Sequence, residues 1–165
     1  MMMPRTSSLL GLAVAAGLML MAATIVAAEG EVTLSAAVES GVPEGFTEDQ
    51  WLDAQATASL VETSSGTDTV ELETRGLVPN GVYTIWWVGQ GTDDSAMGPG
   101  GGAAANEFTA DASGNAETTL TVPSGSGYQK MVVAYHADGQ THGETPGEMG
   151  KQTFVHLAGP WPGAE

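Results

Sequence analysis

Short segments that alternate apolar and polar residues, separated by turn-forming residues, fill most of this chain between Glu31 and Leu157. In Thr67–Arg75, Val70 and Leu72 point one way while Glu71 and Glu73 point the other, which is the pattern of a strand with one buried face. Turn segments rich in Gly, Asn, Asp and Pro recur about every eight to twelve residues. The pattern predicts an all-β fold, an antiparallel β-sandwich of about 7–8 strands.

Two turns and one long loop are predicted to connect the strands. Asn80-Gly81 is a strong hairpin signal because both residues accept a positive φ, and Asp111–Asn115 also reads as a hairpin turn. Residues 89–105 are rich in glycine and predict a long loop. The two prolines of Gly159–Gly163 predict a tail that does not extend a strand. The strands are predicted at Glu31–Glu39, Ala56–Thr63, Thr67–Arg75, Val82–Val88, Asn106–Ala110, Ala116–Val122, Lys130–His136 and Lys151–Leu157.

One short helix is predicted near residues 48–55. Thr47 and Gln50 have the spacing of a capping box, in which each side chain bonds to the other residue's backbone N–H. Phe46 and Trp51 stand at the two positions of a hydrophobic staple. We therefore expect Trp51 to be a packing residue.

Residues 1–28 have the three parts of a secretory signal peptide. Arg5 supplies the positive charge, Leu9–Met21 is apolar, and Val26–Ala28 offers a small-residue cleavage site. An uncleaved N-terminal anchor is the alternative, because the apolar stretch continues to Ala28. We expect a secreted protein, periplasmic or extracellular.

The remaining residues 29–165 predict a single acidic β-sandwich domain. The chain has no cysteine, so its core must hold the fold without disulfides. Its formal net charge is −16, with 20 acidic residues against 4 basic ones. This balance excludes a nucleic-acid surface and argues against an anionic membrane surface as partner. Either the surface is adapted to high salt, or it binds cations or a basic protein.

The segments Gly76–Pro79, Val82–Thr84 and Trp86–Val88 resemble a group of secreted, largely uncharacterised all-β proteins. These share a G-L-x-P…Y-T-x-W-W core hairpin, and the resemblance covers about residues 70–160. Some of those proteins carry a histidine near the C-terminal strands, for which His136 and His142 are the candidates here. The resemblance implies a secreted β-sandwich and no particular reaction.

All three histidines lie in the last 30 residues of the chain. By alternation, His136 shares a face of its strand with Val132 and Ala134, and His156 shares a face with Phe154. If the two strands pair, both imidazoles could meet on one face, with His142 or Asp138 completing a metal site. Imidazole and carboxylate ligands suit zinc or copper.

A tight hairpin at Asp138-Gly139 would instead turn His142 away from His136, so a site shared by these two requires a wider loop. The alternative to any metal site is that His136 and His156 are half-buried strand residues that bond to loop backbone. No known metal-binding spacing is present.

Trp86 and Trp87 point to opposite faces of one strand, and an exposed one could bind a carbohydrate or a protein partner. No nucleophile elbow surrounds Ser124 or Ser126, which disfavours a serine hydrolase. The sequence establishes no enzyme activity, and we expect a protein that is not an enzyme. Three functions remain open: a metal-binding domain, a ligand-binding or surface-interaction module, and a structural envelope protein. A monomer is the default expectation.

Overall fold

The computed structural model describes residues 30–62 and 66–164 of the chain. The predicted signal segment, residues 1–28, lies outside the described residues. No helix among the described residues is long and apolar enough to cross a membrane. The described elements are β1 (Val32–Ala36), α1 (Glu48–Leu52), β2 (Gln55–Glu62), β3 (Thr67–Arg75), β4 (Val82–Gln90), β5 (Asp93–Pro99), β6 (Glu107–Thr109), β7 (Ala116–Pro123), β8 (Tyr128–His136) and β9 (Thr153–Pro160).

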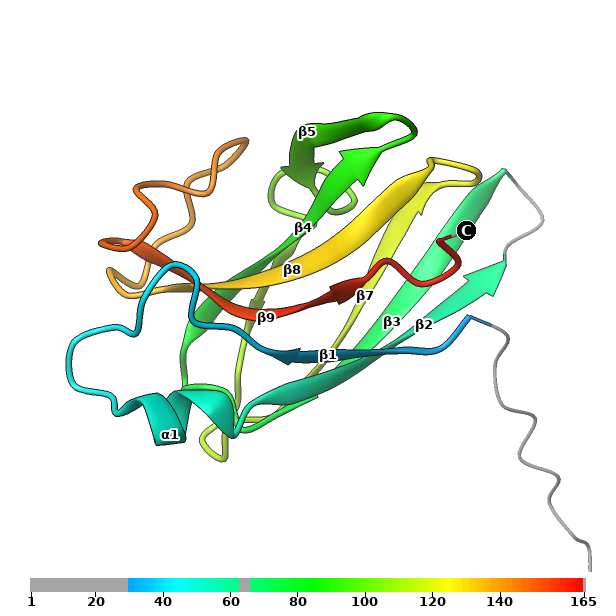
Figure 1. Cartoon of the computed structure of the whole chain (residues 1–165). Coiled ribbons are helices and arrows are strands. Elements are labelled where there is room, and N and C mark those ends of the chain that lie inside the picture. The colour runs from blue at the N-terminus through cyan, green and yellow to red at the C-terminus, as the bar shows by residue number, and fades with distance from the viewer. Residues whose placement is uncertain (1–29, 63–65, 165) are drawn as a thin grey trace, which may run out of the picture.

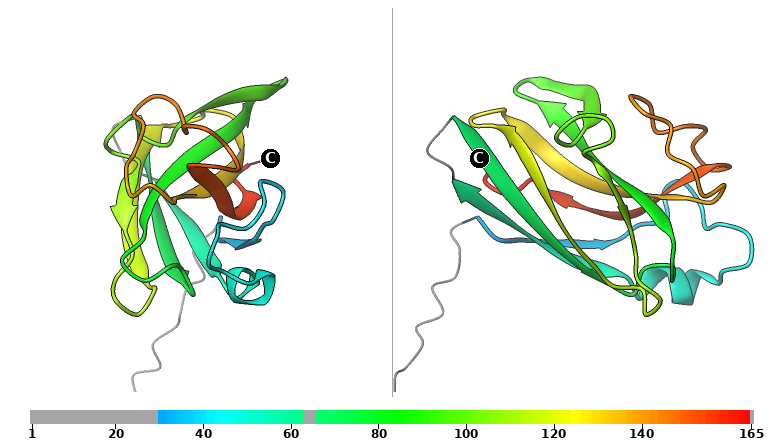
Figure 2. Two further views of the ribbon diagram at one scale, coloured as in Figure 1. Left: turned by 90° about the vertical axis from the view of Figure 1, so that its left-hand side faces the viewer. Right: turned by 180° about the vertical axis from the view of Figure 1, so that it is seen from behind.

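All named strand pairs are antiparallel and belong to one sheet with the order β5-β4-β8-β9-β1-β2-β3-β7, while β6 pairs with β4. The sheet is curled, so that β3 and β7 face β4 and β8 (Figures 1 and 2). Leu72, Leu120, Ile85 and Val133 meet in one buried core between these two halves. The predicted all-β, sandwich-like fold is confirmed.

The two predicted hairpins are wrong, although both turns exist. β3 pairs with β2 and β7, whereas β4 pairs with β5, β6 and β8, so the strands on either side of Asn80-Gly81 lie in opposite halves of the sheet. Residues 76–81 and 111–115 are both arches between the halves, and they bond to each other through Leu77 N to Gly114 O (2.9 Å) and Asn80 N to Asp111 O (3.0 Å). A turn signal fixes the reversal of the chain but not which strands then pair.

One strand, β5, lies where the sequence predicted only a loop. It pairs with β4, with Trp87 opposite Gly98. Gly98 is required there because a Cβ would lie 2.6 Å from the Trp87 ring. The glycines that suggested a loop therefore let the strand lie flat against a tryptophan.

The short helix α1 has the predicted capping box, with Thr47 and Gln50 bonded reciprocally. It ends at Leu52, earlier than predicted, because Gln55 already belongs to β2. Trp51 is buried, and its indole N–H donates to the Ala37 carbonyl at 2.8 Å. Its predicted packing role is confirmed.

Strand β9 continues further than the prolines suggested. Gly159 pairs with Met131 and Pro160 pairs with Lys130, so the prediction that this tail extends no strand is wrong for its first two residues. Pro160 is the last residue of the strand, a position where a missing N–H does not interrupt the ladder. After Pro160 the chain runs toward β2 and β3, where Gly163 lies against Leu60 (Figure 1).

Candidate metal centre

His136 lies on the outer face of the sheet, although it is buried. Met131 and Val133 of β8 belong to the core, so the alternate residues Ala134 and His136 point outward. Only 1% of His136 is exposed. The covering segment is the loop of residues 137–152 between β8 and β9, drawn in orange in Figure 1.

His156 lies on the opposite, inner face. His136 pairs with Thr153 and Tyr135 pairs with Phe154, which places Phe154 on the inner face. The register then shifts: Ala134 pairs with Val155 but Val133 pairs with Leu157, so His156 is the extra residue of a β-bulge. The prediction that His136 and His156 share one site is wrong, because the register puts Thr153 opposite His136.

Both ring nitrogens of His156 have partners in the core. Nε2 lies 3.0 Å from the Trp51 carbonyl, and Nδ1 lies 2.9 Å from the Tyr83 hydroxyl, which also accepts the Val78 N–H. A carbonyl only accepts, so Nε2 carries the proton and the Tyr83 hydroxyl donates to Nδ1. The His156 ring also stacks on Trp51 with centroids 3.6 Å apart. Burial lowers the pKa of His156 to about 4, so this imidazole is a neutral structural group and offers no lone pair to a metal.

His136 is the centre of a chain of hydrogen bonds whose direction is fixed at both ends. The Trp86 indole N–H donates to Thr84 Oγ1 (2.8 Å), which lies 2.8 Å from His136 Nε2. On the other side, His136 Nδ1 lies 3.3 Å from Thr153 Oγ1, which donates to the Pro146 carbonyl. An indole N–H only donates and a carbonyl only accepts, so every group is satisfied when Thr84 donates to Nε2 and Nδ1–H donates to Thr153. His136 is then neutral, with its proton on Nδ1.

Asp138 and His142 come from the loop to the side of His136. One potential ligand atom from each of the three residues lies within 4.8 Å of the other two. The rings of His136 and His142 have centroids 5.5 Å apart. The tight hairpin at Asp138-Gly139 does not form: the chain turns there, with Gly139 N bonded to the His136 carbonyl, but the next strand begins only at Thr153. The wider loop that a shared site requires is therefore present.

His142 Nε2 has an unusual environment. It lies 3.2 Å from Asp138 Oδ2, but the geometry is not that of a hydrogen bond, and the nitrogen is buried without a hydrogen-bond partner. Asp138 Oδ1 accepts the Gln140 N–H at 3.1 Å, which orients the carboxylate. Gly147 packs against the imidazole so closely that a Cβ there would lie 2.5 Å from His142 Cδ2. The loop thus holds an imidazole nitrogen and a carboxylate oxygen 3.2 Å apart without hydrogen-bond geometry between them.

The surroundings of His136 shift its pKa in opposite directions. Burial lowers the pKa of His136 below its ordinary value, and the neighbouring His142 lowers it further, while the carboxylates of Asp138 and Glu107 act in the opposite direction. Glu107 was not predicted as a site residue. It approaches the site because β6 pairs with β4 and sets Glu107 opposite Thr84, a pairing that no local sequence pattern indicates.

The tryptophan pair offers less than predicted to an external ligand. Trp86 is buried with its N–H bonded to Thr84, so its predicted role in ligand binding is wrong. Trp87 is half-buried, and the Tyr128 ring stacks on it with centroids 4.5 Å apart and an interplanar angle of 9°. One face of Trp87 is therefore already occupied.

Comparison with known proteins gives no family. No protein-family model matches the chain, and no curated protein matches it significantly.

Proposed function

We propose that this protein is an extracytoplasmic β-sandwich protein that binds one divalent transition-metal ion, zinc or copper, through His136, Asp138 and His142. The observation that carries the proposal is the His142 Nε2 atom, which is buried without a hydrogen-bond partner beside Asp138 Oδ2. A buried imidazole nitrogen without a hydrogen bond costs free energy, and a metal ion shared with Asp138 would supply the missing interaction.

The donor set fits a borderline transition metal. Two imidazoles and one carboxylate suit zinc and copper(II), whereas calcium and magnesium prefer sites built from oxygen atoms. Three protein ligands are also the number found in open zinc sites, where water takes the remaining position. About a quarter of the side chains of His142 and Asp138 is exposed, 23% and 27%, so an ion could enter from solvent.

His136 must change both of its hydrogen bonds to become a ligand, because the bond from Nδ1 breaks and the bond at Nε2 reverses its direction. The bond from Nδ1 to Thr153 Oγ1 is 3.3 Å long, whereas the bond between Nε2 and Thr84 Oγ1 is 2.8 Å long. The longer bond is the weaker one, so Nδ1 exchanges its hydrogen bond for a metal ion more easily. The ring proton then moves to Nε2 and is donated to the second lone pair of Thr84 Oγ1, while the Thr84 hydroxyl turns its own proton away from the ring. Thr84 would thereby orient the ligand from behind, as hydrogen-bond acceptors do for metal-bound histidines.

Calorimetric titration of the metal-free protein with zinc chloride and with copper(II) chloride tests this proposal. We expect a single site with a dissociation constant tighter than about 10 μM for at least one of the two ions. His142→Ala and Asp138→Asn should each weaken binding by about tenfold or more. His156→Gln and Asp94→Asn are the matched controls, because neither residue belongs to the group. Binding weaker than 10 μM in the unmodified protein, or unchanged binding in His142→Ala, would overturn the proposal.

A further inference from the structure

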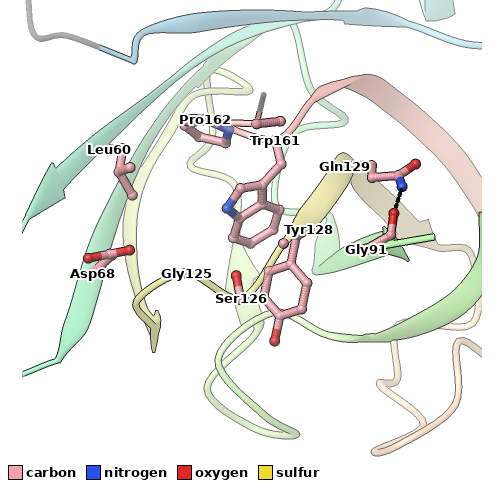
Figure 3. Close-up of a pocket in the computed structure, with 12 residues that line it drawn as sticks. Leu60, Asp68, Gly91, Gly125, Ser126, Tyr128, Gln129, Trp161 and Pro162 are labelled. Carbon is pink, nitrogen blue, oxygen red and sulfur yellow. Dashed lines mark hydrogen bonds between the residues drawn. The ribbon is translucent and has the colours of Figure 1, made fainter. Parts of the chain in front are cut away.

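A second candidate site lies at the other end of β8 and goes beyond the metal centre. β8 runs from Tyr128 to His136, so the two sites lie at opposite ends of this strand. A cleft of about 660 Å³ opens between the turn before β8, the chain after β9, and the facing ends of β2 and β3 (Figure 3). This volume is in the range of small-molecule sites in proteins.

Trp161 forms one wall of the cleft. Its backbone N–H donates to the Gln129 carbonyl at 2.9 Å, and its ring packs edge-to-face with Tyr128, centroids 5.0 Å apart. Only 4% of the residue is exposed. Its indole N–H has no hydrogen-bond partner among the described residues, and Figure 3 shows this nitrogen on the side of the ring that faces Leu60 and Asp68. The wall therefore presents a fixed donor to the cleft.

Asp68 forms the opposite wall and presents an acceptor. Its Oδ1 atom accepts the Ser124 hydroxyl, which holds the carboxylate in place. Its Oδ2 atom has no partner among the described residues. The half-buried ring of Tyr128 and the side chain of Leu60 also line the cleft and add apolar surface to it. A ligand in this cleft would meet a donor, an acceptor and an apolar surface at once.

The charge of the lining restricts the class of ligand. Neither lysine nor arginine lines the cleft, and the formal net charge of the chain is −16, so an anionic ligand would be repelled. A simple ammonium ion would satisfy Asp68, but it has only donors and would leave the Trp161 N–H without an acceptor. A sugar hydroxyl both accepts and donates, and the C–H face of a sugar ring packs on aromatic surface.

We infer that this cleft binds a neutral sugar ring, with the Trp161 indole N–H donating to one hydroxyl and Asp68 accepting from another. Leu60 and the part of the Tyr128 ring that lines the cleft supply the apolar contact, since one face of that ring is already stacked on Trp87. In this proposal the carbohydrate site is the cleft and not the tryptophan pair Trp86 and Trp87 of β4.

Tryptophan fluorescence and calorimetry with a defined panel of sugars test the inference. The panel contains the methyl glycosides of glucose, galactose, mannose and N-acetylglucosamine and their β-linked tetrasaccharides, with choline and spermidine as cationic probes. We expect at least one neutral sugar to bind with a dissociation constant of about 1 mM or tighter. Trp161→Phe, which keeps a ring but removes the N–H, and Asp68→Asn should each weaken that binding by about fivefold or more.

Two comparisons make the outcome decisive. Glu71→Gln, an exposed carboxylate on the same strand as Asp68, should bind the sugar as the unmodified protein does, and thermal melting shows whether each variant folds. If no neutral sugar of the panel binds with a dissociation constant of about 1 mM or tighter, the inference is wrong. It is equally wrong if only choline or spermidine binds, or if Trp161→Phe and Asp68→Asn both bind the sugar unchanged. None of these outcomes depends on the metal centre, because His142→Ala should leave sugar binding intact.

Discussion

The hydroxyl of Thr84 lies 2.8 Å from Nε2 of His136, and this contact connects β4 to the end of its neighbour β8. Thr84 also accepts the Trp86 indole N–H, while the other nitrogen of His136 reaches Thr153 on β9. Three strands and the loop above them are therefore joined by one chain of hydrogen bonds on the outer face of the sheet. The four side chains of Trp86, Thr84, His136 and Thr153 are buried, so each depends on its neighbours in the chain for a hydrogen bond.

Replacing Thr84 by valine should cost about 2–3 kcal/mol of the free energy of unfolding. Valine has nearly the shape of threonine, but it leaves both the Trp86 N–H and His136 Nε2 without a partner. Urea denaturation measures the loss. Thr119→Val, on the exposed face of β7, is the matched control and should change the free energy of unfolding by less than about 0.5 kcal/mol. Equal effects of the two substitutions would show that the Thr84 hydroxyl has no special role.

Gly147→Ala should disturb the metal centre, because the new Cβ would lie 2.5 Å from His142 Cδ2. Gly143→Ala is the matched control: both glycines have a positive φ, +85° and +67°, but the added carbon at Gly143 has no atom within 4 Å. Both variants should lose about 1 kcal/mol of stability from backbone strain. Only Gly147→Ala should weaken zinc or copper binding, by about tenfold, in the same calorimetric titration. Equal binding by the two variants would contradict the position that the structure gives to His142.

Acidification should destabilise the protein through His156. Its pKa is about 4 in the folded protein, against an ordinary value of 6.5, so the unfolded chain takes up a proton first as the pH falls. The stability is therefore complete above pH 6.5 and is lost progressively toward pH 4, where the loss reaches about 3 kcal/mol.

The His156→Gln variant isolates this contribution from that of the many carboxylates. Glutamine has a donor and an acceptor for Trp51 and Tyr83 but does not titrate. Urea denaturation at pH 7 and at pH 4.5 should show a decrease in stability that is about 2–3 kcal/mol smaller in His156→Gln than in the unmodified protein. The same decrease in both proteins would mean that His156 is accessible to protons in the folded state.

Zinc or copper should raise the melting temperature if the ion binds the folded protein alone. At a free concentration one hundred times the dissociation constant, the gain is about 2.7 kcal/mol. Scanning calorimetry measures it. Magnesium controls for the general screening of a chain with a net charge of −16, and His142→Ala controls for the site. A gain that magnesium reproduces, or that survives in His142→Ala, would be due to screening.

Local patterns predicted the parts of this fold that depend on neighbours in the chain. The capping box of Thr47 and Gln50 and the burial of Trp51 follow from residues a few positions apart, and both are confirmed. Strand β3 also follows its alternation, with Val70 and Leu72 buried. The hairpin prediction at Asn80-Gly81 was wrong because β3 pairs with β2 and β7 while β4 pairs with β5, β6 and β8, so the two strands beside this turn do not pair with each other.

The sequence by itself determined which residues share a strand face with each histidine. Alternation places His136 on the same face as Ala134, and His156 on the same face as Phe154. Only the tertiary structure decided whether the two histidines share one face of the sheet. The register between β8 and β9 pairs His136 with Thr153, and His156 is the unpaired residue of a β-bulge. It likewise decided that the loop carries His142 back over His136, since contacts such as that of Gly147 with the imidazole form only once the strands are in place. Alternation is a property of one strand, whereas register and loop closure depend on the packing of segments distant in sequence.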